Sequence, residues 1–157
     1  MQTALKLQGV EKSFGEQKAV TALELSVPRG ETCGLIGPSG AGKTTSIRLI
    51  MSILFPDAGT VEVLGQASAL QAKDRIGYLP EERGVYRKMK VWAFLKYLAG
   101  LKGMPESASQ PRANELLAAL GLEGILQKRC EELSKGMLQR VQFVGAYADN
   151  LNWGMEA

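Results

Sequence analysis

The chain has 157 residues with a net charge of +3, and its 19 basic residues are spread among 16 acidic ones. A hydrophobic fraction of 45% beside 22% charged residues is typical of a soluble globular domain and excludes an intrinsically disordered chain. No apolar run approaches the roughly 18 residues of a membrane-spanning helix, and the N-terminus lacks the pattern of a secretory leader.

Two further features of composition bear on the compartment and on the partners of the chain. Cys33 and Cys130 have neither metal-ligand nor redox spacing, which favours a reduced, cytosolic chain in which Cys33 is a small buried hydrophobic residue. Dense positive charge occurs only between positions 83 and 90, where we expect a solvated surface, with partner or phosphate contact as the alternative. Its members are Arg83, Arg87, Lys88 and Lys90. We therefore expect no nucleic-acid partner.

The N-terminal segment has the two-residue period of half-buried strands. Apolar residues alternate over positions 5–10 and again over 23–27, and a turn at Phe14-Gly15-Glu16 separates the two runs. This pattern predicts a β-hairpin.

Residues 37–45 read GPSGAGKTT and contain the phosphate-loop pattern G-x-x-x-x-G-K-[ST]. The apolar segment 32–36 before it predicts a buried strand, and the apolar positions between 47 and 54 predict a helix after it. Glycines allow backbone N–H groups to approach a phosphate, and a helix N-terminus adds partial positive charge. Lys43 supplies a mobile charge, and Thr44 offers a hydroxyl to Mg²⁺. The alternative, a glycine-rich turn before an ordinary helix, requires neither the glycine spacing nor the Lys-Thr pair. The expected contact residues are Gly37, Pro38, Ser39, Gly40, Ala41, Gly42, Lys43, Thr44 and Thr45.

Beyond the phosphate loop the pattern changes from strands to helices. A turn at 56–59 precedes a predicted strand at 60–64, a short helical stretch covers 69–74, and a second strand at 76–79 stops at Pro80. Three amphipathic helices follow. The first covers 91–101, the second begins after Pro111 and stops at Gly121, and the third begins near Ser134 and extends towards Ala148.

The order of these segments resembles the ATP-binding subunits of ATP-binding-cassette (ABC) transporters. The resemblance covers most of residues 3–148 and rests on KSFG at 12–15, GPSGAGKTT, IGYLPEERG at 76–84 and LSKGMLQRVQF at 133–143. The last two segments are most similar to the exporter-type, sodium-export-like subset. The resemblance implies an α/β P-loop fold of ABC type, with an N-terminal antiparallel β-subdomain and a helical signature subdomain. It also implies ATP and Mg²⁺ as ligands.

Further residues take roles from the same resemblance. Phe14 matches the aromatic residue that stacks on adenine, with a place in the core as the alternative. Glu81 stands where most of the family has a Gln that reaches the Mg²⁺, and its negative charge would oppose the γ-phosphate. The signature comprises Leu133, Ser134, Lys135, Gly136 and Met137, and in the family it covers the nucleotide bound by a second cassette. For Ser134 the alternative is a plain helix N-cap.

The chain departs from the family pattern after residue 148. An apolar strand ending in an Asp for Mg²⁺ and an adjacent Glu for water activation is absent, and the sequence contains no His. Asp149 and Glu156 lie at a helix end and near the terminus, so neither is a convincing substitute. We therefore expect a cassette truncated before this strand. Its phosphate-loop strand would lack flanking parallel strands, and the isolated monomer would be prone to aggregation or partly molten.

These observations predict one partial ABC ATP-binding domain over 1–157. Within it, 1–80 form the β-subdomain and phosphate-loop core, 81–148 the helical subdomain, and 149–157 a divergent tail. The expected function is Mg-ATP binding coupled to a membrane permease, by a chain that pairs with a second cassette at the inner face of the cell membrane. A non-catalytic regulatory or remnant module is the alternative. A cassette acting on nucleic acid would need long charged or coiled-coil insertions between Glu82 and Leu133, and none is present.

Overall fold

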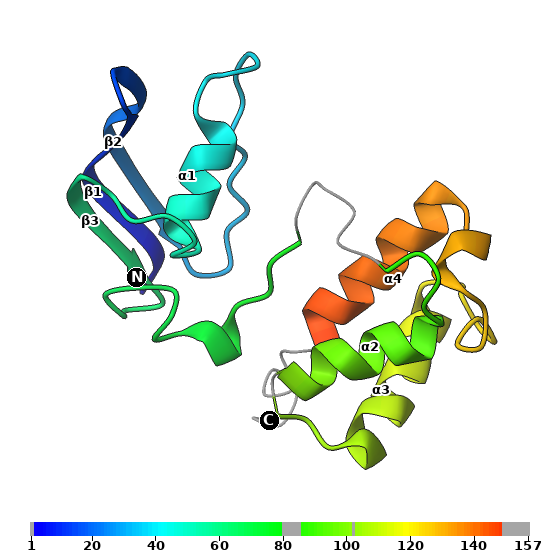
Figure 1. Ribbon diagram of the computed structural model, residues 1–157. Helices are drawn as coiled ribbons and strands as arrows, with labels where there is room; N and C mark the ends of the chain where they lie inside the picture. Colours follow the sequence, from blue (N-terminus) through cyan, green and yellow to red (C-terminus); the bar gives the residue numbers. More distant parts are fainter. Residues whose placement is uncertain (1, 80–85, 102, 149–157) are drawn as a thin grey trace. The chain divides into compact units, whose positions relative to one another are not determined.

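A computed structural model describes residues 2–79, 86–101 and 103–148. The chain divides into two compact units, Met1–Lys73 and Asp74–Ala157. The first contains the strands and the glycine loop, and the second contains three longer helices (Figure 1). Glu81, the basic Arg83, Asp149 and Glu156 lie outside the described residues.

The first unit is built on an antiparallel sheet of order β2-β1-β3. Strands β1 (Thr3–Phe14) and β2 (Gln17–Pro28) form the predicted hairpin, with Phe14 opposite Gln17 at the turn. Strand β3 (Ala58–Val63) pairs with the other edge of β1 and begins two residues before the predicted position. The two-residue period therefore predicted the two strands of the hairpin, and the turn at 56–59 indicated the third strand.

Helix α1 (Lys43–Ile50) packs on one face of this sheet (Figure 1). Leu49 is buried against Leu7, Val10 and Val20, and these four residues form the core of the unit. The helix ends earlier than the apolar pattern suggested, because Ser52 adopts a positive φ of 55° that a right-handed helix cannot continue. Ile53 is consequently more than half exposed.

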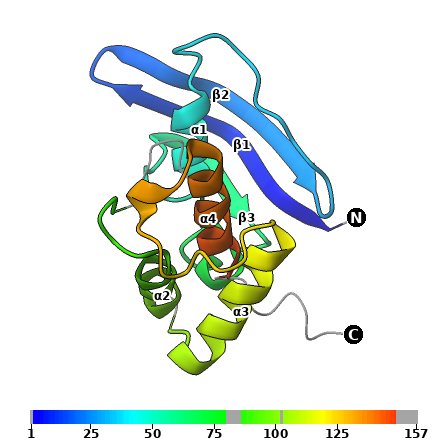
Figure 2. The ribbon, with the colours of Figure 1, turned by 90° about the vertical axis from the view of Figure 1, so that its right-hand side faces the viewer.

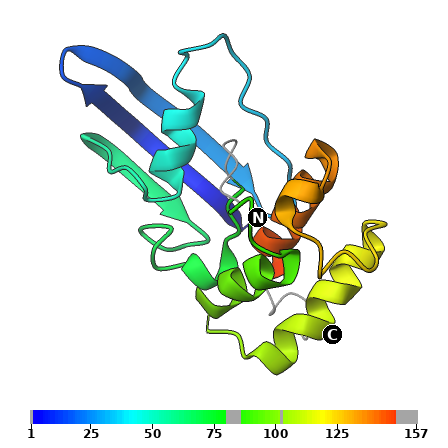
Figure 3. The same cartoon turned by 45° about the vertical axis from the view of Figure 1, so that its right-hand side comes forward.

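The predicted strand at 32–36 is wrong. Residues 31–38 have no regular structure, residues 31–40 are all exposed, and the segment forms an open arc between β2 and α1 (Figure 3). A strand needs a neighbour to pair its N–H and C=O groups, and none of the described strands lies beside this segment. Cys33 is therefore exposed, against the prediction that it is buried.

Two predictions between residues 69 and 79 also need correction. Residues 69–72 form turns, and the only helical geometry is a short 3₁₀ turn at Lys73–Arg75. Residues 76–79 do not form a strand, again because no described strand pairs with them.

The second unit contains α2 (Val91–Leu101), α3 (Glu106–Ala119) and α4 (Lys135–Ala148), which pack against one another (Figure 2). Their core includes Phe94, Leu117 and Val144. The face of α4 that meets α2 carries Gly145, and a Cβ atom there would lie 2.5 Å from Leu98 Cδ1, so the glycine permits close packing.

The start of α3 differs from the prediction. The helix begins at Glu106 after an extended Pro105, and Pro111 lies inside it. Both prolines are start signals, but helix geometry begins at the earlier one, at the cost of the backbone hydrogen bond that Pro111 cannot donate. Gly121, with a φ of 67°, follows the helix end as predicted.

We predict that Gly59→Ala destabilises the first unit strongly. Gly59 has a φ of 83°, and an added Cβ would lie 2.3 Å from the carbonyl oxygen of Gly9 on β1. Left-handed strain alone costs about 1–2 kcal/mol for an alanine, and the backbone clash adds to it. Urea unfolding followed by circular dichroism measures the change.

Gly65→Ala is the matched control, because Gly65 has a φ of 78° but no atom within 4 Å of the added Cβ. It should show the conformational cost without the clash. Equal losses of unfolding free energy in the two variants would contradict the close approach at Gly59.

Candidate phosphate-binding site

The glycine loop ends at Gly42, which is fixed by two constraints. It has a φ of 83°, and an added Cβ would lie 2.3 Å from the carbonyl oxygen of Ala19 on β2. Any other residue would be strained and would collide with the sheet. The glycine loop therefore places the N-terminus of α1 against β2 at one defined point.

The amide groups at this helix start are donors without acceptors. Helix α1 has neither a side-chain cap nor an acidic residue in its first turn. Within the described part of the chain, the N–H groups of Lys43, Thr44 and Thr45 have no hydrogen-bond partner, and the first helical bond runs from Ser46 N–H to Gly42 O, at 2.8 Å. Unpaired amides and the helix dipole together favour an anion here.

Lys43 folds back over the loop. Its Nζ donates to the carbonyl oxygens of Gly37 and Pro38, both at 2.7 Å. These acceptors are neutral, so they leave the ammonium charge uncompensated. The nine predicted contact residues, 37–45, thus include a turn at 39–40, unpaired amides at the start of α1 and a cation, which are the groups that a phosphate site would need.

Metal binding at this place would depend on the bound phosphates. Thr44 is exposed and offers a hydroxyl oxygen. In residues 2–79, 86–101 and 103–148 no three His, Cys, Asp or Glu side chains are grouped as a metal site would require. Mg²⁺ commonly uses few protein ligands together with phosphate oxygens and water, so the hydroxyl fits that role.

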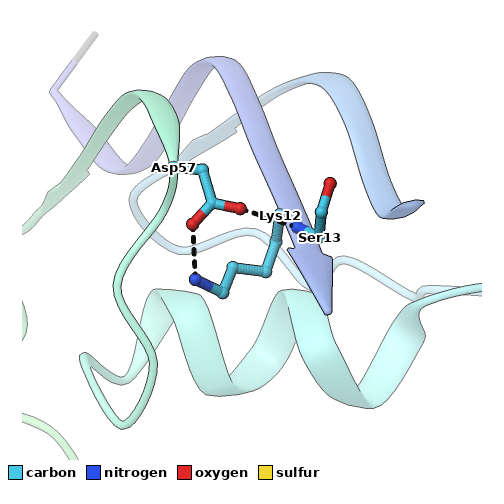
Figure 4. Close-up of polar contacts among 3 residues, drawn as sticks. All are labelled: Lys12, Ser13 and Asp57. Carbon is cyan, nitrogen blue, oxygen red and sulfur yellow. Dashed lines mark hydrogen bonds and ion pairs between the residues drawn. The ribbon is translucent and has the colours of Figure 1, made fainter. Parts of the chain in front are cut away.

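Phe14 lies at the end of β1 and is 50% exposed, so the alternative that it belongs to the core is wrong. The ammonium of Lys12 lies 5.9 Å from the centre of its ring. Lys12 is held in turn by Asp57, whose carboxylate accepts from Lys12 Nζ at 2.6 Å and from Ser13 N–H at 2.7 Å (Figure 4). The composition and motifs did not single out Asp57, because its partners lie 44 and 45 residues away in the sequence.

These contacts change the acidity of Asp57. The hydrogen bonds from Lys12 and then from Ser13 N–H hold the pKa of the Asp57 carboxyl below its ordinary value. The ionised form is thus the one that the folded chain stabilises.

In the second unit, Ser134 is the N-cap of α4. Its Oγ accepts from Met137 N–H at 3.3 Å, and its carbonyl accepts from Leu138 N–H at 2.9 Å. Leu133 is buried, whereas Ser134, Lys135 and Gly136 are exposed. The capping role is therefore present, and the three exposed residues remain accessible at a helix N-terminus.

The segment before Ser134 is anchored by backbone hydrogen bonds to the start of α2. Cys130 N–H donates to Met89 O and Val91 N–H donates to Lys128 O, both at 2.9 Å. The Cys130 thiol is buried, and burial raises its pKa. Arg140, which sequence analysis noted only as part of a motif, donates from Nη1 to Leu120 O at 2.8 Å and so satisfies the C-terminus of α3.

A cavity of about 440 Å³ lies elsewhere in the first unit, beside the end of α1 and β3. Its lining includes Leu49, Phe55 and Val61 but none of residues 37–45. The candidate phosphate site is thus an open, polar surface, not this largely apolar hollow.

Comparisons with known proteins agree with these features. The family model described as "ABC transporter" matches residues 20–152. The uncharacterised ABC transporter ATP-binding protein YhaQ of Bacillus subtilis is 42% identical over 142 residues, which cover 90% of this chain and 48% of the relative. MJ1023 of Methanocaldococcus jannaschii, described in the same words, is 37% identical over 150 residues, or 96% of this chain and 54% of its own length.

The solved structure of an ATP-binding subunit of an ABC transporter superposes with a TM-score of 0.81 at 29% identity, over 94% of this chain and 62% of that one. The chain thus has the α/β P-loop fold of these subunits, with its antiparallel sheet and its helical unit. It spans about half the length of the curated relatives that it matches.

We predict that Asp57 makes the free energy of unfolding depend on pH in the acid range. Because its folded pKa is lowered, its contribution is complete above the unfolded pKa of about 4 and disappears as the pH falls through the folded value. Thermal unfolding between pH 7 and pH 2 should show a smaller acid-induced loss of stability in Asp57→Asn than in the wild type. Glu62→Gln, an exposed carboxylate on β3 without an ion pair in the described residues, should keep the wild-type profile. A wild-type profile in Asp57→Asn would contradict the role of this carboxylate.

Proposed function

The chain belongs to the ABC transporter family, and we propose that it forms part of the ATP-binding component, holding Mg-ATP on residues 37–45 and coupling nucleotide binding and hydrolysis to a membrane permease. The observation that carries this proposal is the start of α1, where unpaired amides and the Lys43 ammonium converge. A polyphosphate is the ligand that satisfies both.

Each residue of the site would contribute a separate interaction. The amides of residues 43–45 would bind phosphate oxygens, and Lys43 would exchange the carbonyls of Gly37 and Pro38 for a charged acceptor. Thr44 would hold Mg²⁺, which would supply positive charge to the phosphates. Phe14 would stack on adenine, which its exposure permits. Glu81 remains a candidate Mg²⁺ neighbour from the family pattern alone.

We further propose that both units are subdomains of a single cassette and that Leu133–Met137 faces the nucleotide of a second cassette. Support comes from the exposed Ser134, Lys135 and Gly136 at the N-terminus of α4, a second place where a helix dipole favours an anion. No helix in the described residues is long and apolar enough to cross a membrane. The proposed location, against a permease at the cytoplasmic face, rests on the family, and the segments at 76–84 and 133–143 favour export.

For the 157 residues by themselves we propose nucleotide binding with turnover near background. The sequence contains neither a His nor an apolar strand that ends in adjacent Asp and Glu residues, so the residue that would activate water is missing.

We predict that Lys43→Ala weakens Mg-ATP binding by about tenfold or more, because it removes a charge-assisted hydrogen bond to phosphate. Isothermal titration calorimetry measures the affinity, and phosphate release measures the turnover. Arg48→Ala is the control, since it removes an exposed cation from the last turn of the same helix. Equal affinities of Lys43→Ala and wild type would refute the site. Steady ATP hydrolysis that Lys43→Ala abolishes would instead refute the proposed low turnover.

A further inference from the structure

Asp57 joins three consecutive residues at the end of β1. Its carboxylate accepts from Lys12 Nζ at 2.6 Å and from Ser13 N–H at 2.7 Å (Figure 4). Its own N–H donates to Glu11 O at 2.9 Å. The residue is thus bonded to the backbone or side chain of every position from 11 to 13. Phe14 is the next residue along the strand.

Sheet pairing supports this strand end on the β2 side only. The pairing of β1 with β3 stops at Glu11 opposite Ala58, and the pairing with β2 has irregularities on both sides of Lys12. Without Asp57, residues 12–14 would be held only by this irregular edge. The Asp57 carboxylate therefore takes the place of the backbone hydrogen bonds that β3 does not supply to this end of β1.

The same contacts bear on the aromatic ring. Lys12 Nζ is held by Asp57 and lies 5.9 Å from the centre of the Phe14 ring, within the range of a cation–π interaction. The ammonium approaches one face of the ring, and half of the Phe14 surface remains exposed. This exposure leaves part of the ring accessible to a flat ligand while Lys12 restrains it.

This strand end lies close to the glycine loop in the register of the hairpin. Lys12 pairs with Val20 on β2, and Val20 and its neighbour Ala19 are the residues against which Gly42 packs. The ring and the start of α1 are thus at the same end of one hairpin, as the two ends of a single nucleotide require.

We propose that Asp57 is a positioning residue for the nucleobase: through Lys12 and Ser13 it fixes the orientation of Phe14 for stacking, without contact with the phosphates. This inference rests on the proposed function, since it assumes that ATP occupies the glycine loop. It gives Asp57 a role in the affinity for the base that is separate from the affinity for the phosphates.

The test compares Mg-ATP with Mg-tripolyphosphate, which has the same phosphate chain but no base. In Asp57→Asn, the affinity for ATP should fall about three- to tenfold, while that for tripolyphosphate should stay within about twofold, because loss of stacking affects only the ligand with a base. Lys12→Met removes the charge and leaves the Asp57–Ser13 bond, and it should give the same split. Glu62→Gln should change neither affinity. Calorimetric titration gives both dissociation constants.

A double-mutant cycle adds a readout that a merely structural role would not move. Phe14→Ala should weaken ATP binding, and Asp57→Asn added to it should cost nothing further. Equal losses for both ligands in Asp57→Asn and in Lys12→Met, unchanged ATP affinity, or additive effects with Phe14→Ala would overturn the positioning role. A wild-type chain that binds neither ligand would overturn the proposed function, and the inference with it.

Discussion

The contact of Gly42 with the carbonyl oxygen of Ala19 is the constraint on which the first unit depends. It sets where α1 begins, while Leu49, buried against Leu7 and Val10 near the other end, sets how the helix lies on the sheet. Burial of one such leucine contributes about 1.5–3 kcal/mol. A helix fixed near both ends presents its N-terminal amides in one direction. The open arc at 31–40 can then be irregular without moving them.

In the second unit the start of helix α4 is also held in place, but by different contacts. The start of α4 has no glycine held against a strand; its position follows from hydrogen bonds between the 3₁₀ turn Cys130–Glu132 with its flanks and the segment before α2. Buried Leu133 and Cys130 anchor this segment in the helical core. Ser134 is consequently exposed on a hydrogen-bonded, partly buried segment, which suits a residue that caps its own helix.

The periodicity of the sequence predicted the helices and strands that depend mainly on interactions between residues close together in the sequence. Alternation predicted the hairpin, a preceding turn indicated β3, and 3.6-residue spacing with glycine signals predicted the helix after the phosphate loop, the helix ending at Leu101 and the stop of α3 before Gly121. The α/β P-loop fold is what the resemblance carried by the ordered motifs implies. The expected strands at 32–36 and 76–79 failed because strand formation depends on a pairing partner, which an apolar run does not reveal. The exposure of Cys33 is part of that failure. Asp57 and Arg140 were not predictable in their roles, since each acts through a residue at least 20 positions away.

The charges at the shared end of the hairpin assign different roles to its two lysines. Lys12 is paired with the Asp57 carboxylate at 2.6 Å, so its ammonium already has an anionic partner where it lies against Phe14. Lys43 is bonded only to neutral carbonyls among the described residues, so its charge remains available. Removing an anionic partner from Lys12 would cost more than replacing carbonyl partners of Lys43 by phosphate oxygens. On the proposed function, the phosphates therefore go to Lys43 and the base to the ring beside Lys12, and this separation of charge gives the nucleotide its direction along the sheet.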